Sequence, residues 1–113
     1  MSYTLHWHEK AKEDLIGIAR LVAWRFSKTV AERMVSRIRD DANLLRDNPF
    51  LGAKSPVQRP DGVVCRELVS KKNRIVYIVI DDRIDILAVF DTRRNPEETY
   101  KSIKTETHKT IKT

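Results

Sequence analysis

Apolar and polar positions in the second half of the chain predict three consecutive strands, at residues 64–69, 73–80 and 83–90. The middle segment is apolar at almost every position, which is typical of a central strand covered on both faces. Short polar turns join the segments, so we expect an antiparallel meander. The buried face of the last strand is expected to consist of Ile84, Ile86, Ala88 and Phe90.

The first half of the chain changes from a strand pattern to a helix pattern. Tyr3, Leu5 and Trp7 alternate with polar residues, as in a short edge strand. From Glu9 the apolar residues recur every three or four positions, which predicts a first helix that ends near Phe26. Its expected buried stripe is Ala11, Leu15, Ile18, Ala19, Val22 and Phe26.

A second helix is predicted between a hydroxyl cap at Ser27 or Thr29 and the Asn48–Pro49 pair. The short connection between the two helices favours an antiparallel hairpin. Leu21 and Trp24 lie outside the buried stripe of the first helix. Two interpretations stay open for them: they pack against a neighbouring helix, or they form a docking surface.

These elements predict one α+β domain with the order β-α-α-β-β-β, in which the helical hairpin packs against the meander sheet. A proline- and glycine-rich loop at residues 48–63 precedes the meander. A further short helix is expected at about 96–105, because a proline and two acidic residues open it. We therefore assign the domain to residues 1–105 and a polar, flexible tail to residues 106–113.

The composition narrows the classes of function. The chain has 113 residues and a formal net charge of +6, which favours a polyanionic or acidic protein partner. A single cysteine excludes an internal disulfide, and we expect a cytoplasmic protein without a membrane segment. Neither a phosphate-binding glycine loop nor a set of zinc ligands is present, so we expect no cofactor and no metal.

The predicted strand pairing brings basic residues to one end of the sheet. A turn centred between Asp81 and Asp82 places Arg74 beside Val89, while Arg66 and Glu67 lie further along the sheet. The resulting basic cluster is Lys71, Lys72, Arg74, Arg93 and Arg94. Such a cluster can bind phosphates or an acidic protein surface, and it can equally be a solvated end of the sheet.

Cleavage of RNA without a metal also needs groups that accept and donate a proton. Glu67 and Tyr100 have suitable side chains, whereas His6, His8 and His108 are expected to lie outside the basic cluster. The catalytic candidates for such a ribonuclease are therefore Arg74, Arg93, Tyr100 and Glu67, with no firm assignment. The shortage of proton-transfer partners favours a contact surface over an active site.

The order of elements and several short motifs resemble the RelE/ParE superfamily of toxins from type II toxin–antitoxin modules. The matching residues are Ala11, Asp14, Leu15 and Ile18, then Asn48–Pro49 and Leu51–Gly52, then Arg66–Glu67–Leu68, Arg74–Ile75–Val76–Tyr77 and Arg93–Arg94–Asn95–Pro96. They extend over nearly the whole chain to about Tyr100.

The Arg-Glu-Leu motif and the Arg-Arg-x-Pro ending look more like the ParE branch, which poisons DNA gyrase, than the RelE branch, which cuts messenger RNA on the ribosome. RelE's basic pair on the first meander strand is replaced here by Cys65 and Glu67. The resemblance implies growth inhibition through gyrase and neutralisation by an antitoxin in a hetero-oligomer, with Leu21 and Trp24 covered. The alternatives are a ribosome-dependent endoribonuclease and a non-toxic binding protein that retains the fold.

Overall fold

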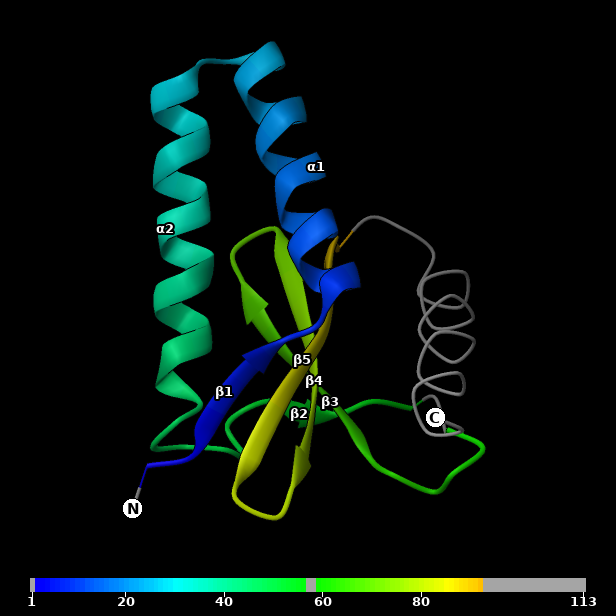
Figure 1. Ribbon diagram of the computed structural model, residues 1–113. Helices are drawn as coiled ribbons and strands as arrows, with labels where there is room; N and C mark the ends of the chain where they lie inside the picture. The colour runs from blue at the N-terminus through cyan, green and yellow to red at the C-terminus, as the bar shows by residue number, and fades with distance from the viewer. Residues whose placement is uncertain (1, 57–58, 93–113) are drawn as a thin grey trace.

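The computed structural model describes residues 2–56 and 59–92, which form two helices and five strands (Figure 1). The helices are α1 (Glu9–Arg25) and α2 (Lys28–Leu44). The strands are β1 (Thr4–Trp7), β2 (Ala53–Lys54), β3 (Cys65–Ser70), β4 (Asn73–Ile80) and β5 (Arg83–Asp91). The predicted helix at 96–105 and the predicted tail lie outside the described residues.

The five strands form one mixed sheet in the order β1-β5-β4-β3-β2. Strands β3, β4 and β5 pair antiparallel through two-residue turns, which confirms the predicted meander. The sequence did not predict β2, which pairs antiparallel with β3 inside the loop before the meander. At the opposite edge, β1 runs parallel to β5, because the helical hairpin returns the chain to the start of the sheet.

The helical hairpin forms as predicted and covers one face of the sheet (Figure 1). Only two residues separate α1 from α2, and the Ser27 hydroxyl caps α2 by accepting a hydrogen bond from the Val30 amide at 3.1 Å. Apolar residues of both helices pack against β4 and β5 in one buried cluster: Ala11, Leu15, Ile38, Ala42, Leu45, Ile75, Tyr77, Ile84, Ile86 and Val89. Burial of this apolar cluster stabilises the packing of the hairpin on the sheet.

A β-bulge at Leu87 changes the predicted register of the sheet. Val76 pairs with Ala88 but Tyr77 pairs with Ile86, so Leu87 is one extra residue on β5. The predicted pairing of Arg74 with Val89 is therefore wrong, and Arg74 faces Phe90 instead. Beyond Leu87, the alternation of β5 side chains between the two faces of the sheet is therefore shifted by one residue.

The bulge also divides the predicted buried face of β5. Ile84 and Ile86 face the helices as expected, whereas Ala88 and Phe90 belong to a second apolar cluster with Cys65, Val76, Ile78 and Leu87. Val89 takes the helix-facing position, and its amide donates a hydrogen bond to the Asp14 carboxylate of α1 at 3.0 Å. Asp14 thus satisfies an amide on the edge of β5 that β1 is too short to reach.

The far end of the hairpin, where α1 meets α2, extends beyond the sheet (Figure 1). Phe26 lies there and is 73% exposed, so its predicted place in the buried stripe is wrong. Trp24 is 82% exposed and Leu21 is 51% exposed, so Trp24 does not pack against the neighbouring helix. The sequence pattern of α1 continues past the point where the sheet can bury it.

Candidate functional site

The predicted basic cluster is partly visible at one end of the sheet. Lys71 and Lys72 form the β3–β4 turn, both are exposed, and Lys71 has a positive φ of 54°. The Thr92 amide donates a hydrogen bond to the Lys72 carbonyl at 2.8 Å, so β5 ends beside this turn. Arg93 and Arg94, with the catalytic candidate Tyr100 and with His108, lie outside the described residues.

Arg74 and Glu67 form an ion pair on the sheet face opposite the hairpin. The Arg74 Nη1 atom donates to the Glu67 Oε1 atom at 2.6 Å, between adjacent strands β4 and β3. The Glu67 side chain is 9% exposed and the Arg74 side chain is 40% exposed. The prediction that Glu67 lies away from the basic cluster is therefore wrong, because the diagonal between the two strands brings it to Arg74.

Arg66 points to the other face of the sheet. Its pairing with Tyr77 is as predicted. The Arg66 Nη1 atom donates to the Gly52 carbonyl at 2.8 Å, and the guanidinium lies 4.9 Å from the centre of the Phe50 ring. Arg66 therefore holds the loop before the meander in place through a hydrogen bond and a cation–π contact.

Tyr77 anchors the same loop from inside the core. The Gly52 amide donates to the Tyr77 hydroxyl oxygen at 2.8 Å, and that hydroxyl donates to the Pro49 carbonyl at 2.9 Å. A Cβ atom at Gly52 would lie 2.8 Å from both the Glu67 carbonyl oxygen and the Tyr77 ring, so only glycine fits. Burial raises the pKa of Tyr77 above its ordinary value, while the Gly52 hydrogen bond and the Arg66 charge oppose the rise.

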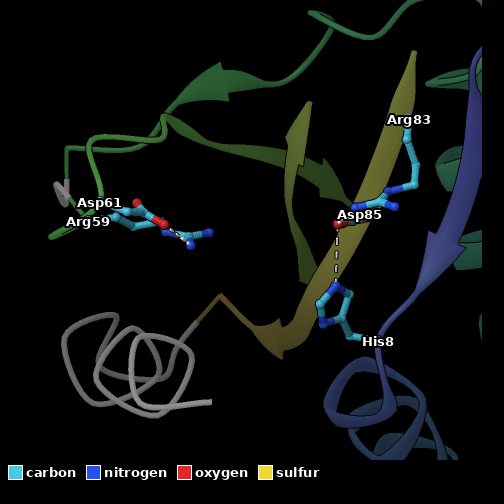
Figure 2. Close-up of polar contacts among 5 residues, drawn as sticks. All are labelled: His8, Arg59, Asp61, Arg83 and Asp85. Atoms are coloured by element: carbon cyan, nitrogen blue, oxygen red, sulfur yellow. Dashed lines mark hydrogen bonds and ion pairs between the residues drawn. The ribbon is translucent and has the colours of Figure 1, made fainter. Parts of the chain in front are cut away.

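Cys65 has the properties of a structural thiol. It is 1% exposed, and burial raises its pKa although the neighbouring Arg59 guanidinium acts in the opposite direction. Arg59 is itself buried and forms an ion pair with Asp61 (Figure 2). A protonated, inaccessible thiol is not a nucleophile.

The N-terminal histidines belong to a different polar group at the opposite edge of the sheet. The His8 Nε2 atom lies 3.5 Å from the buried Asp85 Oδ2 atom, and Arg83 also contacts Asp85 (Figure 2). The His6 and His8 rings are 5.3 Å apart. Strand β5 separates β1 from the strand of Arg74, so these imidazoles lie more than one strand spacing from the Glu67–Arg74 pair.

Two grooves lie between the helices of the hairpin. The first has a volume of about 410 Å³ and is lined by Trp7, Lys12, Leu15, Ile16, Ala19, Val35 and Arg39. The second, of about 640 Å³, shares Ala19, Val35 and Arg39 with it and continues toward the α1–α2 connection. The first groove is lined mostly by apolar residues, whereas the second also carries charges of both signs, among them Arg20, Glu32 and Asp40.

Within residues 2–56 and 59–92, no group of three or more histidine, cysteine, aspartate or glutamate side chains is placed to hold a metal ion. In the same part of the chain, neither helix is long and apolar enough to cross a membrane.

The contacts of Tyr77 with Pro49 and Gly52 were not predicted from the sequence. The motifs carrying the family resemblance contained all three residues, but only the loop geometry shows that they touch. Asp85 was missed too, because it reads as one polar position in an alternating strand. The available signal was a single aspartate inside a strand that is otherwise almost wholly apolar, since an aspartate is seldom buried without a partner.

A family model described as the ParE toxin of the parDE type II toxin–antitoxin system matches residues 5–96. The match covers both helices and all five strands of the described structure except Thr4, the first residue of β1. A search of curated protein sequences finds no significant match.

Several solved structures share the fold. One is the chromosomal ParDE toxin–antitoxin system of P. aeruginosa, with a TM-score of 0.68 and 23% identity over 80% of this chain and 96% of that chain. The RelBE2 complex of Mycobacterium tuberculosis has a TM-score of 0.59 and 18% identity over 80% and 92%. Free E. coli RelE, as a double mutant, has a TM-score of 0.57 and 21% identity over 94% and 98%.

Proposed function

Because this chain belongs to the ParE toxin family of type II toxin–antitoxin systems, we propose that it inhibits growth in the cytoplasm by binding DNA gyrase, and that a cognate antitoxin neutralises it. The family match over residues 5–96 is the observation that carries this proposal. The geometry agrees with a binding mechanism, because Lys71 and Lys72 are exposed at the sheet end and no histidine of the described chain lies beside Arg74.

The contact with gyrase is assigned to the basic cluster. Lys71 and Lys72 present two charges on a tight turn, and Arg74 is held by Glu67 at 2.6 Å so that its guanidinium is oriented. An oriented guanidinium recognises carboxylates or phosphates on a partner with two parallel hydrogen bonds. The cluster would therefore contact an acidic patch on gyrase or the DNA that gyrase holds.

The test combines a supercoiling assay with purified gyrase and mapping of transcript 5′ ends after toxin expression. The toxin is expected to inhibit supercoiling, and the variant with Lys71→Gln and Lys72→Gln is expected to lose most of this inhibition. A matched control replaces two exposed cations of α2, Lys28 and Arg33, by Gln. Full inhibition by the Lys71/Lys72 variant, or equal loss in the control, would contradict the assignment.

A ribosome-dependent endoribonuclease is the second candidate, and the Glu67–Arg74 geometry supports it. Glu67 can accept a proton from a 2′-hydroxyl while Arg74 stabilises the charge on the phosphate. Their 2.6 Å contact places the two groups within reach of one phosphodiester. Cleavage within codons, lost in the Glu67→Gln variant, would establish this activity in place of gyrase inhibition.

The antitoxin is proposed to cover Leu21 and Trp24 on the hairpin. Trp24 is 82% exposed, and large exposed aromatic residues are common energetic anchors of protein interfaces. The Trp24→Ala variant is expected to bind antitoxin at least tenfold more weakly in a calorimetric titration. Phe50→Ala is the matched control, because Phe50 is 60% exposed in the loop before β2. An unchanged dissociation constant for a folded Trp24→Ala protein would contradict this placement.

A further inference from the structure

The outward face of α1 carries one exposed stripe that the fold does not use. Gly17, Leu21 and Trp24 follow one another at spacings of four and three residues, which places them on the same side of the helix. All three are exposed, Leu21 to 51% and Trp24 to 82%. We call these three residues the outer stripe.

Gly17 is unexpected at this position. A glycine in the middle of a helix is less favourable than alanine, because it loses more backbone freedom when the helix forms. A Cβ atom at Gly17 would meet nothing within 4 Å, so neither the sheet nor α2 requires a glycine there. Without a side chain at this position, another backbone can approach α1 closely.

The charges beside the outer stripe are arranged around Gly17 in a self-complementary way. Glu13 precedes Gly17 by four residues, and Arg20 follows it by three. Both are exposed, and within the described part of the chain neither forms an ion pair or a side-chain hydrogen bond. If two copies of α1 cross antiparallel at Gly17, Glu13 of each copy lies beside Arg20 of the other.

We propose that the outer stripe is a docking surface for a second copy of this chain. The two α1 helices pair antiparallel about a two-fold axis at Gly17, with two Glu13–Arg20 ion pairs and with Leu21 and Trp24 packed on the opposite helix. A contact between single helices is smaller than the roughly 1,200–2,000 Å² of a stable interface, so the dimer is weak and depends on concentration.

The dimer gives the stripe a regulatory role that rests on the proposed function. Leu21 and Trp24 are the residues assigned above to antitoxin contact, so antitoxin binding and self-pairing exclude each other. Free toxin would then partly cover its exposed apolar surface with a second copy, and antitoxin would replace that copy.

A cysteine introduced at the crossing point tests the pairing in the full chain, purified without antitoxin. Native Cys65 is 1% exposed and does not compete for oxidation. Gly17→Cys is expected to form disulfide-linked dimers under mild oxidation, because Cα atoms at a two-fold crossing lie within the roughly 4–7 Å that a disulfide spans. Ser36→Cys, an exposed position on α2, is the matched control and should stay monomeric. Equal cross-linking of the two variants, or none for Gly17→Cys, would overturn the proposal.

Charge reversal supplies an independent readout without cysteine. In sedimentation velocity, Glu13→Arg and Arg20→Glu are each expected to weaken self-association about tenfold, and the variant with both substitutions is expected to restore it. The monomer fold should not change, since neither side chain has a partner within the described chain. Failure of the double substitution to restore association would also overturn the pairing.

Cognate antitoxin completes the experiment and separates the two proposals. Antitoxin is expected to prevent cross-linking of Gly17→Cys. Antitoxin binding without any cross-linking in its absence would contradict self-pairing and leave the proposed function intact. Cross-linking that persists in the antitoxin complex would support self-pairing and contradict the placement of antitoxin over Leu21 and Trp24.

Discussion

Arg66 and Glu67 are adjacent in β3, yet the structure gives them opposite surroundings. Arg66 faces the hairpin side, where it bonds the Gly52 carbonyl and covers Phe50. Glu67 faces the other side, where it pairs with Arg74. The difference arises because successive side chains of a strand point to opposite faces of the sheet.

The residues of the family motifs have different roles on the two faces of the sheet. The face with Arg66 also holds Tyr77, Pro49 and Gly52, whose hydrogen bonds fix a loop to the core. The face with Glu67 presents a partly exposed ion pair beside the two exposed lysines of the β3–β4 turn. We therefore expect substitutions on the first face to change stability, and substitutions on the second to change toxicity.

The largest loss of stability is expected for Gly52→Ala. Its Cβ atom would lie 2.8 Å from a backbone oxygen and from the Tyr77 ring, and overpacking of this kind costs up to about 3 kcal/mol. Urea unfolding measures the change. Gly17→Ala is the matched control, since its Cβ meets nothing within 4 Å and it should stabilise the protein by about 0.5–1 kcal/mol. Similar effects of both substitutions would contradict the role of Gly52.

Tyr77→Phe is expected to cost about 2 kcal/mol. The change removes the oxygen that accepts from the Gly52 amide and donates to the Pro49 carbonyl. The buried Gly52 amide and the partly buried Pro49 carbonyl are then left without that partner. The free energy of unfolding in urea tests this. Tyr3→Phe serves as the control, because Tyr3 is only partly buried. A Tyr77→Phe protein as stable as the wild type would show that the loop is held by other contacts.

The raised pKa of Tyr77 predicts a fall in stability at alkaline pH. In the unfolded chain, tyrosine ionises near its ordinary pKa of about 10. Folded Tyr77 keeps its proton to higher pH, because burial disfavours the phenolate. Ionisation of the unfolded state alone therefore lowers the free energy of unfolding as the pH rises above about 10.

To test this alkaline effect, the free energy of unfolding in urea is measured at several pH values for the wild type and for the Tyr77→Phe protein. Cys65 contributes a similar slope from lower pH, since burial raises its pKa as well, so both proteins are compared with Cys65→Ala in the background. The slope should be shallower in the Tyr77→Phe protein. Identical slopes would show that Tyr77 ionises equally in both states.

The sequence predicted the elements of the fold better than the contacts between them. Alternation and turn residues located the meander strands to within one residue, because a central apolar strand leaves few other arrangements. The bulge at Leu87 could not be predicted, because an extra residue leaves the apolar composition of β5 unchanged. Phe26 was misplaced because periodicity shows which side of α1 is apolar but not where the sheet ends.

The candidate site was predicted only in outline. The predicted antiparallel pairing placed Lys71, Lys72 and Arg74 near one end of the sheet, because tight turns fix which residues of adjacent strands pair. It could not show that Glu67 reaches Arg74, since diagonal contacts depend on the twist of the sheet and on side-chain rotamers. The roles of all these residues stay predictions until they are tested.

The smallest stability change, with the largest change in toxicity, is expected for Arg74→Gln. The Arg74 side chain is 40% exposed, so solvent screens its ion pair, and its loss should cost about 1 kcal/mol or less. Glu67 retains another interaction, which limits the cost of leaving its carboxylate without Arg74.

Growth inhibition after expression should nevertheless be lost in the Arg74→Gln protein if the Glu67 face contacts the target. Arg66→Gln is the matched control, because it removes the same charge from the adjacent strand but on the hairpin side. That control should lower the free energy of unfolding through the Gly52 contact while the folded fraction remains toxic. Toxicity retained by Arg74→Gln would contradict a contact between the Glu67 face and the target. Toxicity lost equally in a stable Arg66→Gln protein would show that the two faces do not differ in function, because loss of a charge on either face would then have the same effect.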